Sequence, residues 1–285
     1  MKNILIIGKD SYIGEAIYKW LLKFDNKYNV EIVSSIDNKW KEKDYKNYDT
    51  VIDLAGIAHI MNITDDMKEL FYSINRDLTI EIAQYAKTAG VKHFIFFSSM
   101  NVYGDYCQTV KDRKMVNPTS FYGDSKLQGD EGVQALSSKE FLVASVRPPF
   151  VYGKGCKGNY NTISKIAKKT PIFPTFNNKK SMIYIDNLCE FIRLVIDNKE
   201  SGILTPQNKE LISTADLVKE ISSACNHKVL FTSLFNIFIK SGIKINSMIR
   251  RAFSDDCYDI NLSNYYDWNY CVVDFKTSIK RIEGK

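Results

Sequence analysis

The stretch "IIGKDSYIGEAI", residues 6–17, joins an apolar strand to a helix through a turn with glycine at both ends. Gly8 closes the run "NILII", and Ile17 and Leu21 follow Gly14 with the spacing of one helix face. In a dinucleotide fold, the first glycine permits the tight turn and the last lets the helix pack on the strand. The start of such a helix offers free N–H groups to a pyrophosphate. This stretch therefore predicts a β-turn-α unit that binds a dinucleotide.

The middle glycine of this pattern is replaced by Ser11, which is small and could bond a phosphate through its hydroxyl. A strand-to-helix turn without any ligand remains the alternative, because a glycine pattern alone is weak evidence. The residues predicted to contact the dinucleotide here are Gly8, Lys9, Ser11, Tyr12, Ile13 and Gly14.

Short β-branched runs alternate with helical patterns from the N-terminus to "FLVASVRPPF", which ends near Phe150. Nearly continuous apolar strands separated by amphipathic helices indicate a parallel sheet covered on both faces. We therefore expect an α/β fold, a doubly wound parallel sheet over residues 1–150, with a smaller C-terminal lobe over 151–285. Within the lobe, "TPIFPTF" (170–176) is predicted to be a turn.

The composition is that of an ordinary globular protein, with 285 residues, 45% hydrophobic and 25% charged. The net charge of +6 is spread along the chain, without the block of like charges typical of a nucleic-acid-binding arm. Six separated cysteines without a CxxC pair favour reduced thiols in the cytoplasm and no metal site. No apolar run reaches the ~20 residues of a transmembrane helix.

A serine pair and a Tyr-x-x-x-Lys pattern follow one another in the second half of the predicted sheet. Ser98 and Ser99 end the strand "HFIFFSS", where parallel sheets bind ligands. Tyr122 and Lys126 have i, i+4 spacing, which puts them on one face of a helix. An ammonium beside a phenol would lower its pKa from about 10. We predict that Tyr122 is a general acid–base, that Lys126 assists it and that Ser99 holds the reacting oxygen; surface helix residues are the alternative.

The ordered motifs "GxxSxxG", "DLAG", "SSxxVYG", "YGxSK" and "RPPFVYGKG" resemble those of the extended short-chain dehydrogenase/reductase family, specifically its nucleotide-sugar epimerases and reductases. The resemblance covers Met1 to about Asn198. It implies a Rossmann domain with NAD(P), a Ser–Tyr–Lys catalytic set and a C-terminal lobe that holds a nucleoside-diphosphate sugar. It assigns the catalytic serine to Ser99.

The resemblance also implies cofactor contacts for Leu54, Ala55 and Gly56 of "DLAG" and for Asn75, whereas Asp53 stands where the family often has histidine. Tyr122 and Lys126 would also contact the cofactor.

The second strand ends in Ser34 and Ser35, without the acid that would bond the ribose of NAD. These hydroxyls, with Lys9, favour NADP(H) slightly over NAD(H); Asp37 keeps NAD(H) open.

For the substrate, the resemblance to capsule and O-antigen enzymes implies a UDP-sugar contacted by Ser99, Phe150, Asn159 and Lys180. Lys180 replaces a usual arginine, and it would meet the diphosphate as a point charge. Reduction of a UDP-4-keto-6-deoxy-N-acetylhexosamine is the preferred reaction. The alternatives are a 4-epimerase that keeps NAD bound and, from another class, a non-catalytic NADP(H) sensor. The family also suggests a homodimer.

One later segment, "LFNIFIKSGIKINSMIRRAF" (234–253), is apolar and basic at helical spacing. Such a pattern suits a helix at a membrane surface. Packing within the C-terminal lobe is the more ordinary expectation.

Overall fold

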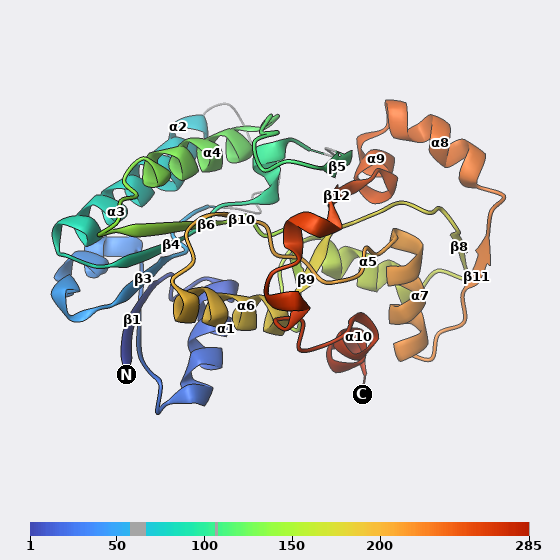
Figure 1. The fold of residues 1–285 in the computed structure, drawn as a ribbon. Coiled ribbons are helices and arrows are strands. Elements are labelled where there is room, and N and C mark those ends of the chain that lie inside the picture. The colour runs from blue at the N-terminus through green and yellow to red at the C-terminus, as the bar shows by residue number, and fades with distance from the viewer. Residues whose placement is uncertain (58–66, 106–107, 285) are drawn as a thin grey trace.

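The computed structural model of the chain describes residues 1–57, 67–105 and 108–284. Its centre is a parallel six-stranded sheet with the strand order β2-β1-β3-β4-β6-β10. This order, with helices on both faces, confirms the predicted doubly wound α/β fold (Figure 1). The strands of this sheet are β1 (Lys2–Ile7), β2 (Tyr28–Val33), β3 (Thr50–Asp53), β4 (His93–Phe97), β6 (Leu142–Val146) and β10 (Gly202–Leu204).

Alternating side chains of the central strands enter two different cores. In β1, Ile4 and Ile6 pack on the face covered by α1 and α6, while Leu5 and Ile7 pack on the face covered by α3 and α4. Burial on both faces explains why these strands are apolar without interruption. The helices of these two layers are α1 (Tyr12–Leu21), α2 (Lys68–Tyr72), α3 (Thr79–Thr88), α4 (Phe121–Gln134) and α6 (Ile185–Asn198).

The predicted sheet ended near Phe150, but the structure adds β10 from beyond that residue. Gly202–Leu204 pairs with β6 in parallel, and the helix before it, α6, packs against α1. Between β2 and β3 the chain forms two short 3₁₀ helices, Ile36–Glu42 and Tyr45–Asn47, in place of an α-helix. The third unit is thus as short as its sequence predicts.

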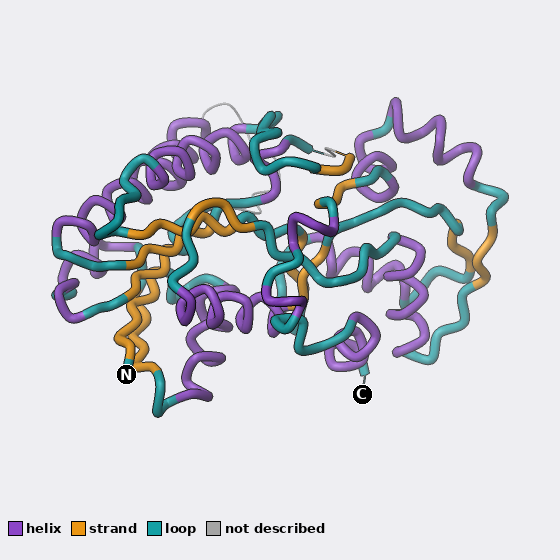
Figure 2. Tube along the Cα trace, in the orientation of Figure 1, coloured by secondary structure: helices purple, strands orange, loops and turns teal. Residues whose placement is uncertain are grey.

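The remaining elements are β5 (Gln108–Val110), which is green in Figure 1 and pairs with β12, and those of the C-terminal lobe, drawn from light green to red in Figure 1 and rich in loops in Figure 2. The segment 170–176, predicted to be a turn, contains the strand β8, which pairs with β11. The elements of the lobe are β7 (Phe150–Tyr152), α5 (Asn159–Ala167), β8 (Ile172–Pro174), β9 (Met182–Tyr184), α7 (Thr214–Ala224), β11 (Leu230–Thr232), α8 (Asn236–Ile245), α9 (Ser247–Phe253), β12 (Asp256–Tyr258) and α10 (Phe275–Glu283).

In the described ranges, no helix combines the length and apolar character needed to cross a bilayer. The five cysteines that these ranges contain have free thiols, and Cys107 lies outside them. Within the same ranges, no group of three His, Cys, Asp or Glu side chains could hold a metal ion.

Candidate functional site

The turn between β1 and α1 is shaped by two glycines that cannot be replaced without a clash. Gly8 has φ +148°, and a Cβ on it would lie 2.9 Å from the Cβ of Leu54 at the end of β3. A Cβ on Gly14 would lie 2.4 Å from the carbonyl oxygen of Gly8. The hydroxyl of Ser11 accepts a hydrogen bond from the Gly14 N–H at 3.3 Å and caps α1. Ser11 is therefore the N-cap of α1. The first N–H groups of this helix face the carboxyl edge of the sheet.

The first turn lies against the end of β2. The backbone N–H groups of Gly8 and Lys9 both donate to the carbonyl of Val33, at 2.9 and 3.0 Å. The hydroxyl of Ser34 donates to the carboxylate of Asp10 at 3.0 Å. A carboxylate, that of Asp10, therefore lies beside the serine that follows β2. The sequence analysis missed it because the residues are 24 positions apart and no motif marks the pair.

Tyr12, Ile13 and Ser35 are the other residues predicted to contact the dinucleotide near this turn. The ring of Tyr12 packs in the core on the α1 side of the sheet, and its phenol is so close to Gly153 that a Cβ there would lie 2.4 Å away. Only its backbone is available to a phosphate. Ile13 packs against the same core, and Ser35 starts the 3₁₀ helix after β2. The side chain of Asp37 lies outside the described part of the chain.

Lys126 is buried at the centre of the candidate site, where several strand ends meet. Its ammonium donates to the carbonyls of Phe97 (3.0 Å) and Ala55 (3.4 Å). A Cβ on Gly56 would lie 2.7 Å from the lysine nitrogen and 2.9 Å from the amide oxygen of Asn75, so a larger residue there would displace these groups. Burial lowers the pKa of Lys126 to about 8, against the attraction of Asp53 and Asp130.

Asn75 connects Gly56 to the helix that carries Lys126. Its amide oxygen accepts from the Ile57 N–H (2.9 Å), and its NH₂ donates to the Ser125 hydroxyl (3.1 Å). The segment Ser73–Leu78 around it is π-helical, a form often found at functional sites. A Cβ on Gly129 would lie 2.3 Å from the Asn75 carbonyl, so α4 crosses this segment at glycine. The Asn75 side chain therefore joins the segment after β3 to α4, and its predicted contact with the cofactor stays a prediction.

Asp53, at the end of β3, is fully buried beside Lys126. One carboxylate oxygen accepts from the Ala55 N–H at 2.8 Å. Burial raises the pKa of Asp53 to about 7, while this hydrogen bond and the Lys126 charge oppose the rise.

Tyr122 and Ser99 are brought together at the start of α4. Ser120 caps this helix by accepting from the Gly123 N–H (3.2 Å), and a Cβ on Gly123 would lie 2.5 Å from the Asn101 carbonyl. The Ser99 hydroxyl, in turn, donates to the Asn101 side chain (3.1 Å). The start of α4 therefore packs on the segment that begins with Ser99.

The pKa of the Tyr122 phenol differs from the prediction. Burial raises its pKa above the ordinary value, and the neighbouring Ser99 hydroxyl lowers it only in part. The lowering expected from Lys126 is not found, because the ammonium is directed at two backbone carbonyls.

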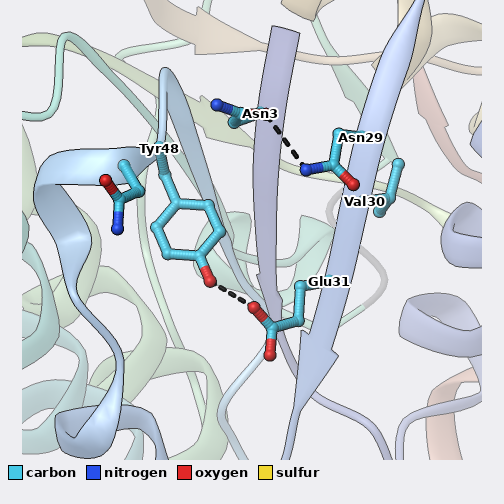
Figure 3. Close-up of a pocket in the computed structure, with 6 residues that line it drawn as sticks. Asn3, Asn29, Val30, Glu31 and Tyr48 are labelled. Atoms are coloured by element: carbon cyan, nitrogen blue, oxygen red, sulfur yellow. Dashed lines mark hydrogen bonds between the residues drawn. The ribbon is translucent and has the colours of Figure 1, made fainter. Parts of the chain in front are cut away.

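A cavity of about 490 Å³ opens beside this helix start, lined by Tyr72, Pro118, Thr119, Ser120, Phe121 and Asp124. A second cavity, of about 300 Å³, lies elsewhere (Figure 3). Its residues Asn3 and Asn29 are at the amino ends of β1 and β2, and Tyr48 donates to Glu31 beside them. Since ligands of parallel sheets bind beyond the carboxyl ends, only the first cavity belongs to the candidate site.

The three predicted lobe residues are spread out. Phe150 begins β7 two residues after Pro148, whose carbonyl accepts from the Met100 N–H beside Ser99 (3.1 Å). Asn159 is exposed at the start of α5. The ammonium of Lys180 donates to the Arg251 carbonyl of α9 at 3.2 Å. Phe150 therefore follows closely on a residue that contacts the Ser99 segment.

Comparison with known proteins agrees with this architecture. Residues 4–205 match the NAD dependent epimerase/dehydratase family. The chain belongs to this family and is therefore an NAD(P)-dependent enzyme with a Rossmann-type domain.

Among curated proteins, the chain is 29% identical to a UDP-glucose 4-epimerase of Vibrio cholerae, over 78% of this chain and 76% of that one. It is 27% identical to an Escherichia coli O157:H7 N-acetyl-α-D-glucosaminyl-diphospho-ditrans,octacis-undecaprenol 4-epimerase, over 80% and 73%. A solved dTDP-4-dehydrorhamnose reductase of Clostridium acetobutylicum has a similar fold, with TM-score 0.73, 20% identity and 98% of both chains covered.

Proposed function

We propose that this enzyme transfers a hydride to C4 of a nucleotide sugar, reducing the 4-keto group of a UDP-4-keto-6-deoxy-N-acetylhexosamine. The observation that carries the proposal is that α4 brings the phenol of Tyr122 to Ser99, with Lys126 one turn further along the same helix. Ketone reduction needs a proton donor at the reacting oxygen, and a phenol, whose ordinary pKa is about 10, is in the donor form at neutral pH.

In this proposal each side chain has one task. Tyr122 delivers its proton to the oxygen at C4 as that oxygen gains negative charge. Ser99 holds the same oxygen by a hydrogen bond. Lys126, whose ammonium is held by the carbonyls of Phe97 and Ala55, contributes a positive charge and a contact to the dinucleotide at the strand ends. When bound, the nicotinamide supplies the hydride.

The dinucleotide fits the residues that are present. The start of α1 between Gly8 and Gly14 would receive the pyrophosphate, and the Asp10–Ser34 pair lies where the adenosine ribose binds in such folds. A carboxylate at this corner accepts a ribose hydroxyl and repels a 2′-phosphate. We therefore propose NAD(H) as the preferred coenzyme, in place of the slight preference for NADP(H) that the serines alone suggested.

A 4-epimerase is the second candidate, and the Asp10–Ser34 pair also favours it because such an enzyme keeps NAD bound. The Vibrio cholerae and Escherichia coli relatives described above are named as 4-epimerases. An epimerase must first remove a proton from the C4 hydroxyl, and Tyr122 would then need its phenolate form.

One experiment separates the two candidates. The purified protein is given a UDP-4-keto-6-deoxy-N-acetylhexosamine with NADH or NADPH, and separately UDP-glucose and UDP-N-acetylglucosamine without added nucleotide. Oxidation of the reduced nicotinamide with the keto-sugar supports the reductase. Product from the second set, together with protein-bound NAD, would support the epimerase and refute the reductase.

A third arm of the experiment uses a polyprenyl-diphosphate-linked N-acetylglucosamine, because the Escherichia coli relative is named for such a substrate. The membership of the enzyme family leaves the non-catalytic sensor without support.

A further inference from the structure

The helix pair α8–α9 and the turn before it carry the most exposed apolar side chains of the described chain. Apart from Met1, every large hydrophobic residue exposed above 65% lies between residues 234 and 248. These residues, called here the apolar face, are Leu234 (76%), Ile237 (70%), Phe238 (72%), Ile245 (86%) and Met248 (80%). Monomeric proteins leave such a concentration exposed chiefly where something binds.

The apolar face exists because α8 packs with its other side. Ile239 and Gly242 are buried, and a Cβ on Gly242 would lie 2.7 Å from Ile249 of α9. Ile237, Ser241 and Ile245 follow one another at intervals of four residues, so they lie on one side of the helix. In Figure 1, α8 lies at the end of the molecule opposite β1. The outward side is therefore presented without cover from the described elements.

Positive charge surrounds the apolar face. Between Glu220 and Asp255 the sequence contains no acidic residue, and it contains five basic ones. Lys240, Lys244 and Arg251 are exposed. Arg250 bends back instead, donating to the carbonyls of Ile243 and Lys244 at 2.9 Å and closing the corner between the helices. The basic residues are Lys228, Lys240, Lys244, Arg250 and Arg251.

We propose that the apolar face docks on the surface of an anionic lipid bilayer. Apolar side chains of an amphipathic helix enter the headgroup–acyl boundary, and lysines beside them reach lipid phosphates. A second copy of the chain is the poorer occupant, because a two-fold contact would place this positive segment against itself. The inference does not depend on the proposed function, since it concerns a surface outside the candidate site.

The test is co-sedimentation of the full-length protein with vesicles of phosphatidylcholine alone or with phosphatidylglycerol. Wild-type protein should bind the anionic vesicles at least roughly tenfold more tightly, and less so in high salt. Ile237→Ser/Phe238→Ser should abolish most of this binding. Lys240→Gln/Lys244→Gln should weaken it by roughly fivefold for each charge.

The matched controls make the same kinds of substitution at exposed positions away from α8. Met115→Ser/Val272→Ser removes two other exposed apolar side chains, and Lys139→Gln removes an exposed charge; both should bind as wild type does. Turnover should be unchanged in the α8 variants. Absence of wild-type binding, or equal binding by the α8 variants, overturns the proposal. So does an Ile237→Ser/Phe238→Ser change that turns a dimer into a monomer in sedimentation velocity, since a second copy would then cover the face.

Discussion

Replacing Gly56 by alanine tests whether the position of the Lys126 ammonium controls the reaction. The added Cβ would lie 2.7 Å from that nitrogen, about 0.7 Å short of an ordinary contact, which begins near 3.4 Å. Lysine can retreat, but its 3.0 Å bond to the Phe97 carbonyl would then lengthen to about 3.7 Å and be lost.

The magnitude follows from that displacement. A hydrogen bond from a charged donor contributes about 1.5–3 kcal/mol, and a misplacement near 1 Å in an active site costs about 100-fold in rate. Gly56→Ala should therefore lower kcat/KM by about 100-fold. Unfolding should lose only about 1–3 kcal/mol, because a flexible side chain absorbs the overlap.

Steady-state kinetics and thermal unfolding measure the two effects. Gly132→Ala is the matched control: its Cβ would lie 2.3 Å from the end of the Ile80 side chain, which can rotate away. Alanine is also favoured over glycine within α4. If Gly56→Ala retains wild-type kcat/KM, the role of Lys126 in this site is wrong. If both variants lose activity equally, the effect is one of general packing.

Three further predictions concern the same site. Tyr122→Phe should lower kcat by about 10²–10⁴-fold with an unchanged melting temperature, as measured by the nicotinamide assay and calorimetry, because only the proton donor is removed; unaltered turnover would show that Tyr122 is not the proton donor. Since burial lowers the pKa of Lys126 to about 8, its charge is lost as pH rises through that value, so kcat/KM should fall above about pH 8; a rate that is level to pH 10 would contradict this. Asp10→Ser should shift the ratio of NAD⁺ to NADP⁺ affinity towards NADP⁺ by at least about tenfold, as measured by calorimetric titration. Ser138→Ala is the remote control and should leave the ratio unchanged. An unchanged ratio in Asp10→Ser would show that Asp10 does not select the coenzyme.

The sequence predicted those features that depend on neighbouring residues. The apolar runs of β1 and β4 indicate buried strands, and the i, i+4 spacing of Tyr122 and Lys126 indicates one helix face; the structure contains both. Each pattern is local, so chain geometry alone determines it.

Contacts between residues far apart in the sequence could not be predicted from it. The Asp10–Ser34 pair, and the convergence of Gly56 and Lys126, depend on how separate β–α units pack. No spacing rule encodes such contacts. The raised pKa of Tyr122 was missed for the same reason, because it follows from the burial of the phenol in the folded protein.

Strand β10 is short, yet it adds a segment from beyond Phe150 to the central sheet, so the two halves of the polypeptide share one sheet. The chain leaves the central sheet after β6, builds β7, α5 and β9, and returns through α6 to close the β6 edge. A fragment cut near Phe150 would expose that edge and uncover the α1 side of the sheet. Limited proteolysis between the halves should therefore release no stable N-terminal piece, and heat should melt the whole enzyme in a single cooperative step.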